Sequence, residues 1–121
     1  MSRAALLLVD DDEMSSQILG YILADEGYEA DTVATGATAV EKFTQKNYDL
    51  VLLDYILPDM KGLEVAKLLK SIKPEARIIL LTGYMMNDES GDNLYERVLL
   101  KPVPPDIIIK TIAEILPSRV L

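Results

Sequence analysis

Near the start of the chain, an apolar run leads directly into three acids, Ala4-Ala5-Leu6-Leu7-Leu8-Val9-Asp10-Asp11-Asp12. A continuous apolar run of this length is typical of a β-strand that is buried on both faces, as strands are in a parallel sheet. Carboxylates directly after such a strand lie at its carboxyl end, where open α/β sheets bind their ligands. The stretch therefore predicts a buried parallel strand with an acidic group at one end.

Four further strand-like runs follow along the chain, at residues 28–34, 50–53, 77–81 and 98–100. Helical patterns separate them, and strands that alternate with helices form a parallel sheet with helices on both faces. Crossovers between parallel strands are right-handed, and a chain of 121 residues leaves few topologies open. We therefore expect an α/β fold with a flavodoxin-like, doubly wound sheet of five strands in the order 2-1-3-4-5.

Apolar residues at helical spacing mark the helices: Met14, Ile18 and Ile22, then Val40 and Phe43, then Val65, Leu69 and Ile72, and finally Ile108, Ile112 and Ile115. Residues that favour helix ends flank these patterns, namely Thr35, Pro104 and Pro105 at helix starts and Gly27, Asn47 and Pro74 at or near helix ends. Residues 85–96 are polar and poorly periodic, so the fourth helix is expected to be short or irregular.

The composition limits both the class of protein and its chemistry. The 121 residues fit a single domain over residues 1–121. The chain contains no cysteine and no histidine, which excludes disulfides, thiolate metal sites and catalysis by Ser-His or Cys-His pairs. A net charge of −8 argues against binding to nucleic acid or to anionic lipid. No stretch approaches the ~18–20 apolar residues of a membrane span, so we expect a cytoplasmic protein.

Polar residues follow four of the five predicted strands. Asp10 and Asp11 follow the first strand, Asp54 the third, Thr82 the fourth and Lys101 the fifth. Each of them alone has an ordinary explanation as a turn former, a helix cap or a solvated side chain. Their common position is informative, because the carboxyl ends of parallel strands lie at the same edge of a sheet.

Chemistry gives a reason for such residues to gather. Carboxylates packed together repel one another unless protons or a cation join them, and a site made only of oxygen ligands favours a hard ion such as Mg²⁺. A metal ion and a lysine can neutralise the charge of a transferred phosphoryl group, while a carboxylate attacks it and forms an acyl phosphate. The pattern predicts this reaction, with Thr82 as a hydrogen-bond donor to a phosphoryl oxygen.

Four motifs, in this order, resemble those of the response-regulator receiver family of two-component signalling systems. They are Leu6-Leu7-Leu8-Val9-Asp10-Asp11-Asp12, then Leu52-Leu53-Asp54 with Pro58, Asp59 and Gly62, then Leu80-Leu81-Thr82-Gly83, and then Leu100-Lys101-Pro102. The resemblance covers about residues 5–116. It agrees with the fold that the strand and helix patterns predict.

The resemblance implies that Asp54 is the phosphoacceptor and that a sensor histidine kinase or a histidine phosphotransfer protein is the donor. It implies Mg²⁺ bound by Asp10, Asp11, Asp54 and the backbone carbonyl of Ile56, and a cis Lys101–Pro102 peptide that aims the lysine inward. Such a domain catalyses its own phosphorylation and slow dephosphorylation, unlike a classical enzyme, and switches a face that a downstream output protein or domain recognises. Asp12 resembles a variable third acid and is expected to cap a helix.

The chain departs from the family pattern at the residues that report phosphorylation. Val98 stands where the family has a tyrosine or phenylalanine that turns inward, and the segment between Thr82 and Arg97 is a few residues short. We therefore expect this segment to couple phosphorylation to output, with Tyr84 or Tyr95 as the substitute aromatic.

Two further positions bear on how long the phosphate persists. In the family, the residues at the positions of Ile56 and Tyr84 flank the route of the hydrolytic water. Neither side chain orients water as an amide or a carboxylate does. The sequence therefore predicts a long-lived acyl phosphate.

Two other functions remain open. A haloacid-dehalogenase-type phosphatase uses an Asp-x-Asp motif after its first strand, which Asp10-Asp11-Asp12 loosely fits, but it leaves Asp54 without a role. An interaction module with a receiver fold that never accepts phosphate is the other alternative, and Val98 favours it. The sequence leaves the donor kinase, the target and the presence of further domains undecided.

Overall fold

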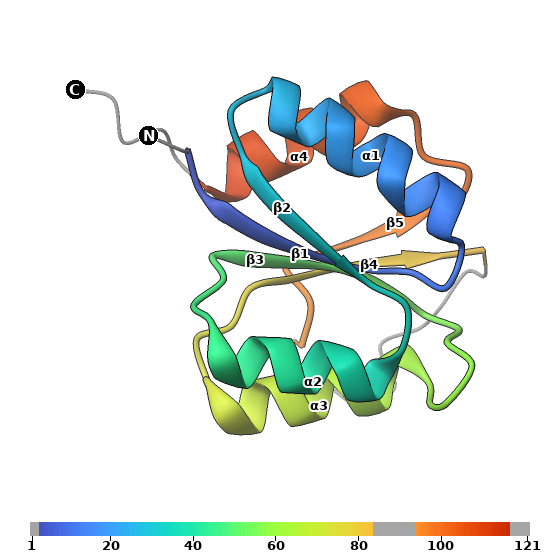
Figure 1. Ribbon diagram of the computed structural model, residues 1–121, viewed down its shortest axis with the longest axis vertical. Coiled ribbons are helices and arrows are strands. Elements are labelled where there is room, and N and C mark those ends of the chain that lie inside the picture. The colour runs from blue at the N-terminus through green and yellow to red at the C-terminus, as the bar shows by residue number, and fades with distance from the viewer. Residues whose placement is uncertain (1–2, 84–93, 117–121) are drawn as a thin grey trace.

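The computed structural model describes residues 3–83 and 94–116. A single parallel sheet forms its centre, with the strand order β2-β1-β3-β4-β5 (Figure 1). Its strands are β1 (Ala5–Val9), β2 (Glu29–Val33), β3 (Leu50–Asp54), β4 (Ile78–Thr82) and β5 (Arg97–Leu100). The expected flavodoxin-like sheet and its strand order are therefore confirmed.

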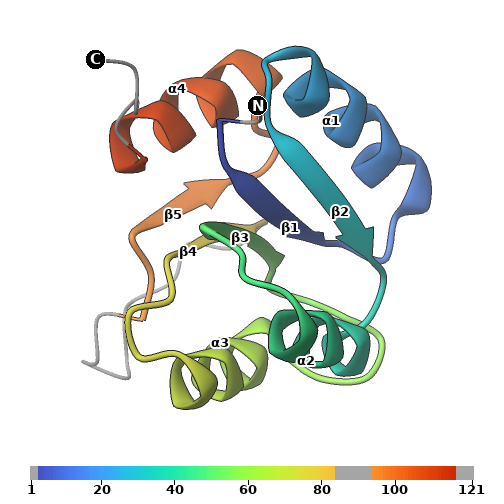
Figure 2. The same ribbon diagram turned by 60° about the vertical axis from the view of Figure 1, so that its left-hand side comes forward.

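Helices cover both faces of the sheet (Figures 1 and 2). The helices α1 (Glu13–Asp25) and α4 (Pro105–Ile115) lie on one face, and α2 (Gly36–Gln45) and α3 (Gly62–Ile72) lie on the other. Most of the helix expected over residues 85–96, namely residues 85–93, lies outside the described part of the chain, and residues 94–96 belong to no helix. None of the described helices is long and apolar enough to span a membrane.

The core has two halves, because successive side chains of the central strands point to opposite faces of the sheet. Leu7, Val51 and Leu53 belong to the half beneath α2 and α3. Leu6 and Leu52 belong to the half beneath α1 and α4. All five residues of β3 and of β4 are buried, as their continuous apolar runs predict.

Helix α1 packs on the sheet with a different face from the one that its apolar spacing suggests. Met14 and Ile18 are 73% and 55% exposed, whereas Ser16 and Leu23 are buried. The helix meets the sheet through small residues as well as leucine, since a Cβ added at Gly20 would lie 3.7 Å from a methyl group of Thr32. The spacing of Met14 and Ile18 thus predicts the helix correctly, but these residues are not part of its buried face.

The residues that favour helix ends act as predicted. Gly27 has a positive φ of 96° just beyond α1, where the amide of Tyr28 donates to the carbonyl of Leu23. Thr35 caps α2 through a capping box with Thr38, and Pro105 is the first residue of α4. Helix α2 ends at Gln45, two residues before the expected Asn47.

Candidate functional site

The carboxyl edge of the sheet brings together the five residues singled out in the sequence. Asp10 and Asp11 follow β1, and Lys101 follows β5. Asp54 and Thr82 are the last residues of β3 and β4, so each of these strands extends one residue beyond the expected end. The topology thus assembles groups that lie up to 91 residues apart in the sequence, from Asp10 to Lys101.

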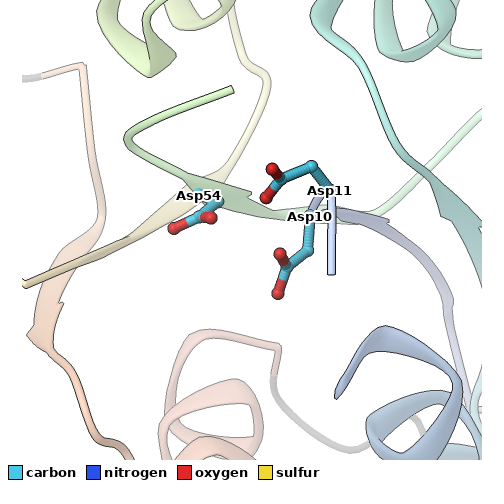
Figure 3. Close-up of side chains that lie close together, drawn as sticks. All are labelled: Asp10, Asp11 and Asp54. Atoms are coloured by element: carbon cyan, nitrogen blue, oxygen red, sulfur yellow. The ribbon is translucent and has the colours of Figure 1, made fainter. Parts of the chain in front are cut away.

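Three carboxylates form the acidic part of the site (Figure 3). Ligand oxygens of Asp10, Asp11 and Asp54 all lie within 4.8 Å of one another. Asp54 is buried, Asp10 is half-buried and Asp11 is exposed. The pKa of Asp10 is raised above 3.8, chiefly by burial and then by the charges of Asp54 and Asp11, although the hydrogen bond from the amide of Asp12 and the charge of Lys101 lower it. The site therefore favours a cation or a proton beside these oxygens.

Lys101 supplies positive charge beside Asp54. Its Nζ lies 2.8 Å from Oδ1 of Asp54. The backbone holds the lysine at the edge of the sheet, because the amide of Lys101 donates to the carbonyl of Thr82 at 2.7 Å. The Lys101–Pro102 peptide is cis, as the resemblance implied.

A pocket of about 430 Å³ opens above this cluster. It is lined by Asp11, Asp54, Tyr55, Ile56, Thr82, Gly83 and Lys101. Thr82 is buried at the end of its strand, whereas the side chain of Ile56 is 55% exposed. Tyr84, the other residue expected to influence the lifetime of the phosphate, lies outside the described residues.

Asp12 has the structural role that we expected. It is the N-cap of α1, and its carboxylate accepts hydrogen bonds from the amide of Ser15 at 3.2 Å and from its hydroxyl at 2.9 Å. These two bonds lower the pKa of Asp12. The carboxylate of Asp12 therefore stabilises the first turn of the helix.

The loop between β3 and α3 contains a residue whose role the sequence did not reveal. The carboxylate of Asp59 accepts hydrogen bonds from the amides of Gly36 and Ala37, at the start of α2. In the sequence, Asp59 was part of the motif that resembles the receiver family, and no role was assigned to it. No local pattern connects it with a helix that begins 23 residues earlier.

The donor atoms fit a magnesium ion. Mg²⁺ prefers oxygen ligands, is bound by a few carboxylates and keeps several of its waters. The three carboxylates satisfy this preference, and the neighbouring pocket leaves room for water and for a ligand. An acidic cluster, a lysine and an open pocket at one strand edge are the parts that phosphoryl transfer to a carboxylate requires.

The model of the family described as response regulator receiver domain matches residues 6–113. The chain belongs to this family. The match includes all five site residues and ends within α4.

Individual receiver proteins are similar over most of the chain. It is 31% identical over 100 residues to the response regulator receiver protein CpdR of Brucella abortus, covering 80% of this chain and 83% of that protein. It is 32% identical over 114 residues to the transcriptional regulatory protein ZraR of Klebsiella oxytoca, covering 92% of this chain but only 26% of ZraR. The receiver chain thus spans about a quarter of that longer relative.

Among solved structures, the receiver chain is similar to the response regulator TrrA of Thermotoga maritima in complex with Mg²⁺-BeF. The TM-score is 0.84 at 35% sequence identity, and the alignment covers 96% of this chain and all of the other. The similarity therefore extends to the whole fold.

The position of the missing aromatic switch lies on the edge strand of this receiver. Val98 is in β5, in register with Leu80 of β4, and is 48% exposed. Tyr95 lies just before β5 and packs against the core beneath α2 and α3. Most of the segment expected to couple phosphorylation to output, residues 84–93, lies outside the described residues.

Proposed function

We propose that this receiver accepts a phosphoryl group on Asp54 from a phosphohistidine of a sensor kinase or a phosphotransfer protein, with Mg²⁺ as cofactor. The observation that carries the proposal is the 2.8 Å contact between Lys101 and an Asp54 whose carboxylate also lies beside those of Asp10 and Asp11. A nucleophile that contacts a cation and adjoins an acidic metal site suits the transfer of an anionic group.

Each residue has a defined part in this proposal. An oxygen of Asp54 forms a bond to phosphorus as the bond from phosphorus to the donor breaks. Lys101 neutralises negative charge on the phosphoryl group, and the hydroxyl of Thr82 donates to one of its oxygens. Asp10, Asp11, Asp54 and the carbonyl of Ile56 hold Mg²⁺, which supplies further charge neutralisation when bound. The TrrA structure in complex with Mg²⁺-BeF supports this assignment by similarity.

The donor is a separate protein or domain, because this chain contains no histidine. The donor is proposed to dock on the outer surface of helix α1 of this receiver, which begins beside the acidic site. Met14, Ile18 and Tyr21 recur on this helix and are among its exposed side chains, and Tyr21 is 77% exposed. An apolar face of this kind suits a helical partner that brings its phosphohistidine to Asp54.

Output is proposed to reach a downstream protein or a separate domain. The longer relative ZraR, of which the chain covers 26%, supports a further domain as one such target. Val98 is too small to act as the usual aromatic switch, so coupling depends on another element whose equilibrium the phosphate shifts.

Incubation with acetyl phosphate and Mg²⁺, followed by intact mass measurement, tests the proposal. The wild type is expected to gain the mass of one phosphoryl group, and Asp54→Asn is expected to gain none while it keeps its fold. Lys101→Ala is expected to retain part of the labelling but to lose any structural response. Labelling of Asp54→Asn to the level of the wild type would contradict the assignment of Asp54.

The intact mass after this incubation, together with an assay of phosphate released from phosphate esters, separates the alternative functions. An interaction module that needs no phosphate would remain unlabelled, and a phosphatase would release phosphate continuously from generic phosphate esters. After the donor is removed, the wild type should lose its phosphate slowly, because the apolar side chain of Ile56 does not orient water. Equal decay rates in the wild type and in Ile56→Asn would contradict that explanation.

A further inference from the structure

The loop between β3 and α3, residues 55–61, carries a proposed metal ligand and is closed at its base. The amide of Gly62 donates to the carbonyl of Tyr55 at 2.6 Å, and Ile56 and Lys61 form an isolated antiparallel bridge. The bond at the base uses the carbonyl of Tyr55, so it does not occupy that of Ile56. The path of the backbone at Ile56 therefore depends both on this bridge and on what holds the rest of the loop.

The outer part of the loop is fixed to a neighbouring helix. Oδ1 of Asp59 accepts from the amide of Gly36 at 2.8 Å, and Oδ2 accepts from the amide of Ala37 at 2.9 Å. Met60 packs beside the same turn, since a Cβ added at Gly36 would lie 2.5 Å from Cγ of Met60. Leu57 is buried in the core. Three side chains thus attach the loop, and one of them bonds to backbone 22–23 residues away.

The bonds from Asp59 add to a helix cap that is already formed within α2. Thr35 accepts from the amide of Thr38 at 3.1 Å, and its carbonyl accepts from the amide of Ala39 at 3.0 Å. Asp59 binds the two remaining amides of the first turn, so that all four are satisfied. The caps differ in what they connect: Thr35 stabilises α2 alone, whereas Asp59 joins α2 to the loop that carries Ile56.

We infer that Asp59 is a positioning residue for the metal site: its carboxylate anchors the β3–α3 loop on the N-terminus of α2 and so holds the carbonyl of Ile56 at the edge of the acidic cluster. This inference rests on the proposed function, because it concerns the same magnesium site. Asp59 does not touch the metal. Its contribution is the orientation of a ligand that belongs to a loop rather than to a strand.

The two caps provide a matched pair of variants. Asp59→Ala removes two bonds to the first turn of α2 and releases the loop, whereas Thr35→Ala weakens the same turn and leaves the loop attached. The measurement is the Mg²⁺ dissociation constant, obtained from a titration that follows the backbone amide signals of Asp11 and Asp54 by NMR. The same spectra show whether each variant is folded, and Asp59→Asn, which keeps the shape and an oxygen acceptor, serves as the milder variant.

Asp59→Ala is expected to weaken Mg²⁺ binding about 10-fold, in the range found when groups that orient metal ligands are removed. The Mg²⁺ dissociation constant of Asp59→Asn should lie between those of Asp59→Ala and the wild type. The dissociation constant of Thr35→Ala should lie within about twofold of the wild-type value, because the loop of that variant stays attached. Equal losses in Asp59→Ala and Thr35→Ala, or unchanged binding in both Asp59 variants, would overturn the inference and leave the proposed function intact. A wild type that binds no Mg²⁺ would contradict the proposed function and this inference with it.

Discussion

At the scale of single residues, two buried tyrosines differ in what their hydroxyl groups contact. The hydroxyl of Tyr48 donates to Oδ2 of Asp31 at 2.6 Å, and Asp31 also receives a hydrogen bond from Lys46 at 2.9 Å. The hydroxyl of Tyr28 is buried and has no hydrogen-bond partner among the described residues. A buried hydroxyl stabilises a fold only when it is paired, so the two side chains should respond differently to the loss of this group.

Tyr48→Phe is expected to lower the free energy of unfolding by about 1–2 kcal/mol at neutral pH, because it removes a hydrogen bond to a charged group. Tyr28→Phe, the control, should leave stability unchanged or raise it by up to about 1 kcal/mol, since it removes an unpaired polar atom. Urea denaturation of both variants provides the measurement. A larger loss in Tyr28→Phe than in Tyr48→Phe would contradict this account.

The effect of Tyr48→Phe should also depend on pH. Burial and the neighbouring Asp31 raise the pKa of Tyr48 to about 12, so the hydroxyl remains a donor throughout. Its hydrogen bond is the largest cause that lowers the pKa of Asp31 below the ordinary 3.8. A lowered pKa stabilises the fold above pH 3.8, and this contribution is lost as the pH falls through the pKa of the folded state. The difference between wild type and Tyr48→Phe should therefore shrink below pH 3.8.

At the scale of the elements, two glycines occupy positions with opposite requirements. Gly20 lies within α1, and a Cβ there would meet only side-chain atoms, at 3.7 Å from Thr32 and 4.0 Å from Leu8. Gly62 is the first residue of α3, and a Cβ there would lie 2.8 Å from the carbonyl oxygen of Asp54. Backbone cannot move aside as a flexible side chain can, so only Gly62 is required by its surroundings.

Gly20→Ala is expected to stabilise the protein by about 1 kcal/mol, because alanine favours a helix interior more than glycine does. Gly62→Ala is expected to destabilise it by about 1–3 kcal/mol, since the added methyl group forces the backbone beside Asp54 to shift. Thermal unfolding of the two variants gives the signs directly. A lower melting temperature for Gly20→Ala would contradict the expectation that a methyl group fits beside Thr32 and Leu8.

At the scale of the whole molecule, the candidate site joins parts of the chain that only the folded sheet brings together. The acids Asp10, Asp11 and Asp54 follow or end two neighbouring strands, and Lys101 follows the edge strand β5. An ion bound by these acids binds the folded state and not the unfolded chain. Its binding free energy therefore adds to the stability of the entire fold.

Mg²⁺ at ten times its dissociation constant is expected to raise the free energy of unfolding by about 1.4 kcal/mol. Thermal melts with MgCl₂, compared with NaCl of equal ionic strength to account for the net charge of −8, provide the measurement. Asp11→Ala should abolish the gain. Asp12→Ala is the matched control: it should lose about 1 kcal/mol of stability as a removed helix cap but keep the full gain from Mg²⁺. An equal gain in Asp11→Ala and in the wild type would contradict the metal site.

Local sequence patterns predicted the strands, most of the helices and their order. The continuous apolar runs of β1, β3 and β4 predicted buried parallel strands. The acids and the threonine at their ends, with the lysine after β5, predicted which edge of the sheet carries the candidate site. Thr35, Gly27 and Pro105 predicted helix boundaries to within two residues. These features are local, because the preference of a residue for a strand, a helix or a cap depends mainly on its near neighbours.

Which surfaces and which distant residues meet became clear from the folded structure alone. The outward orientation of Met14 and Ile18, the bonds of Asp59 to the amides of Gly36 and Ala37, and the contact of Tyr48 with Asp31 are not visible in any local pattern. These partners lie 17–23 residues apart, and whether they meet depends on the paths of the loops and on the packing of each helix against the sheet. The sequence specifies such contacts only through the complete fold, since a helix presents several faces and the packing of the core selects one of them.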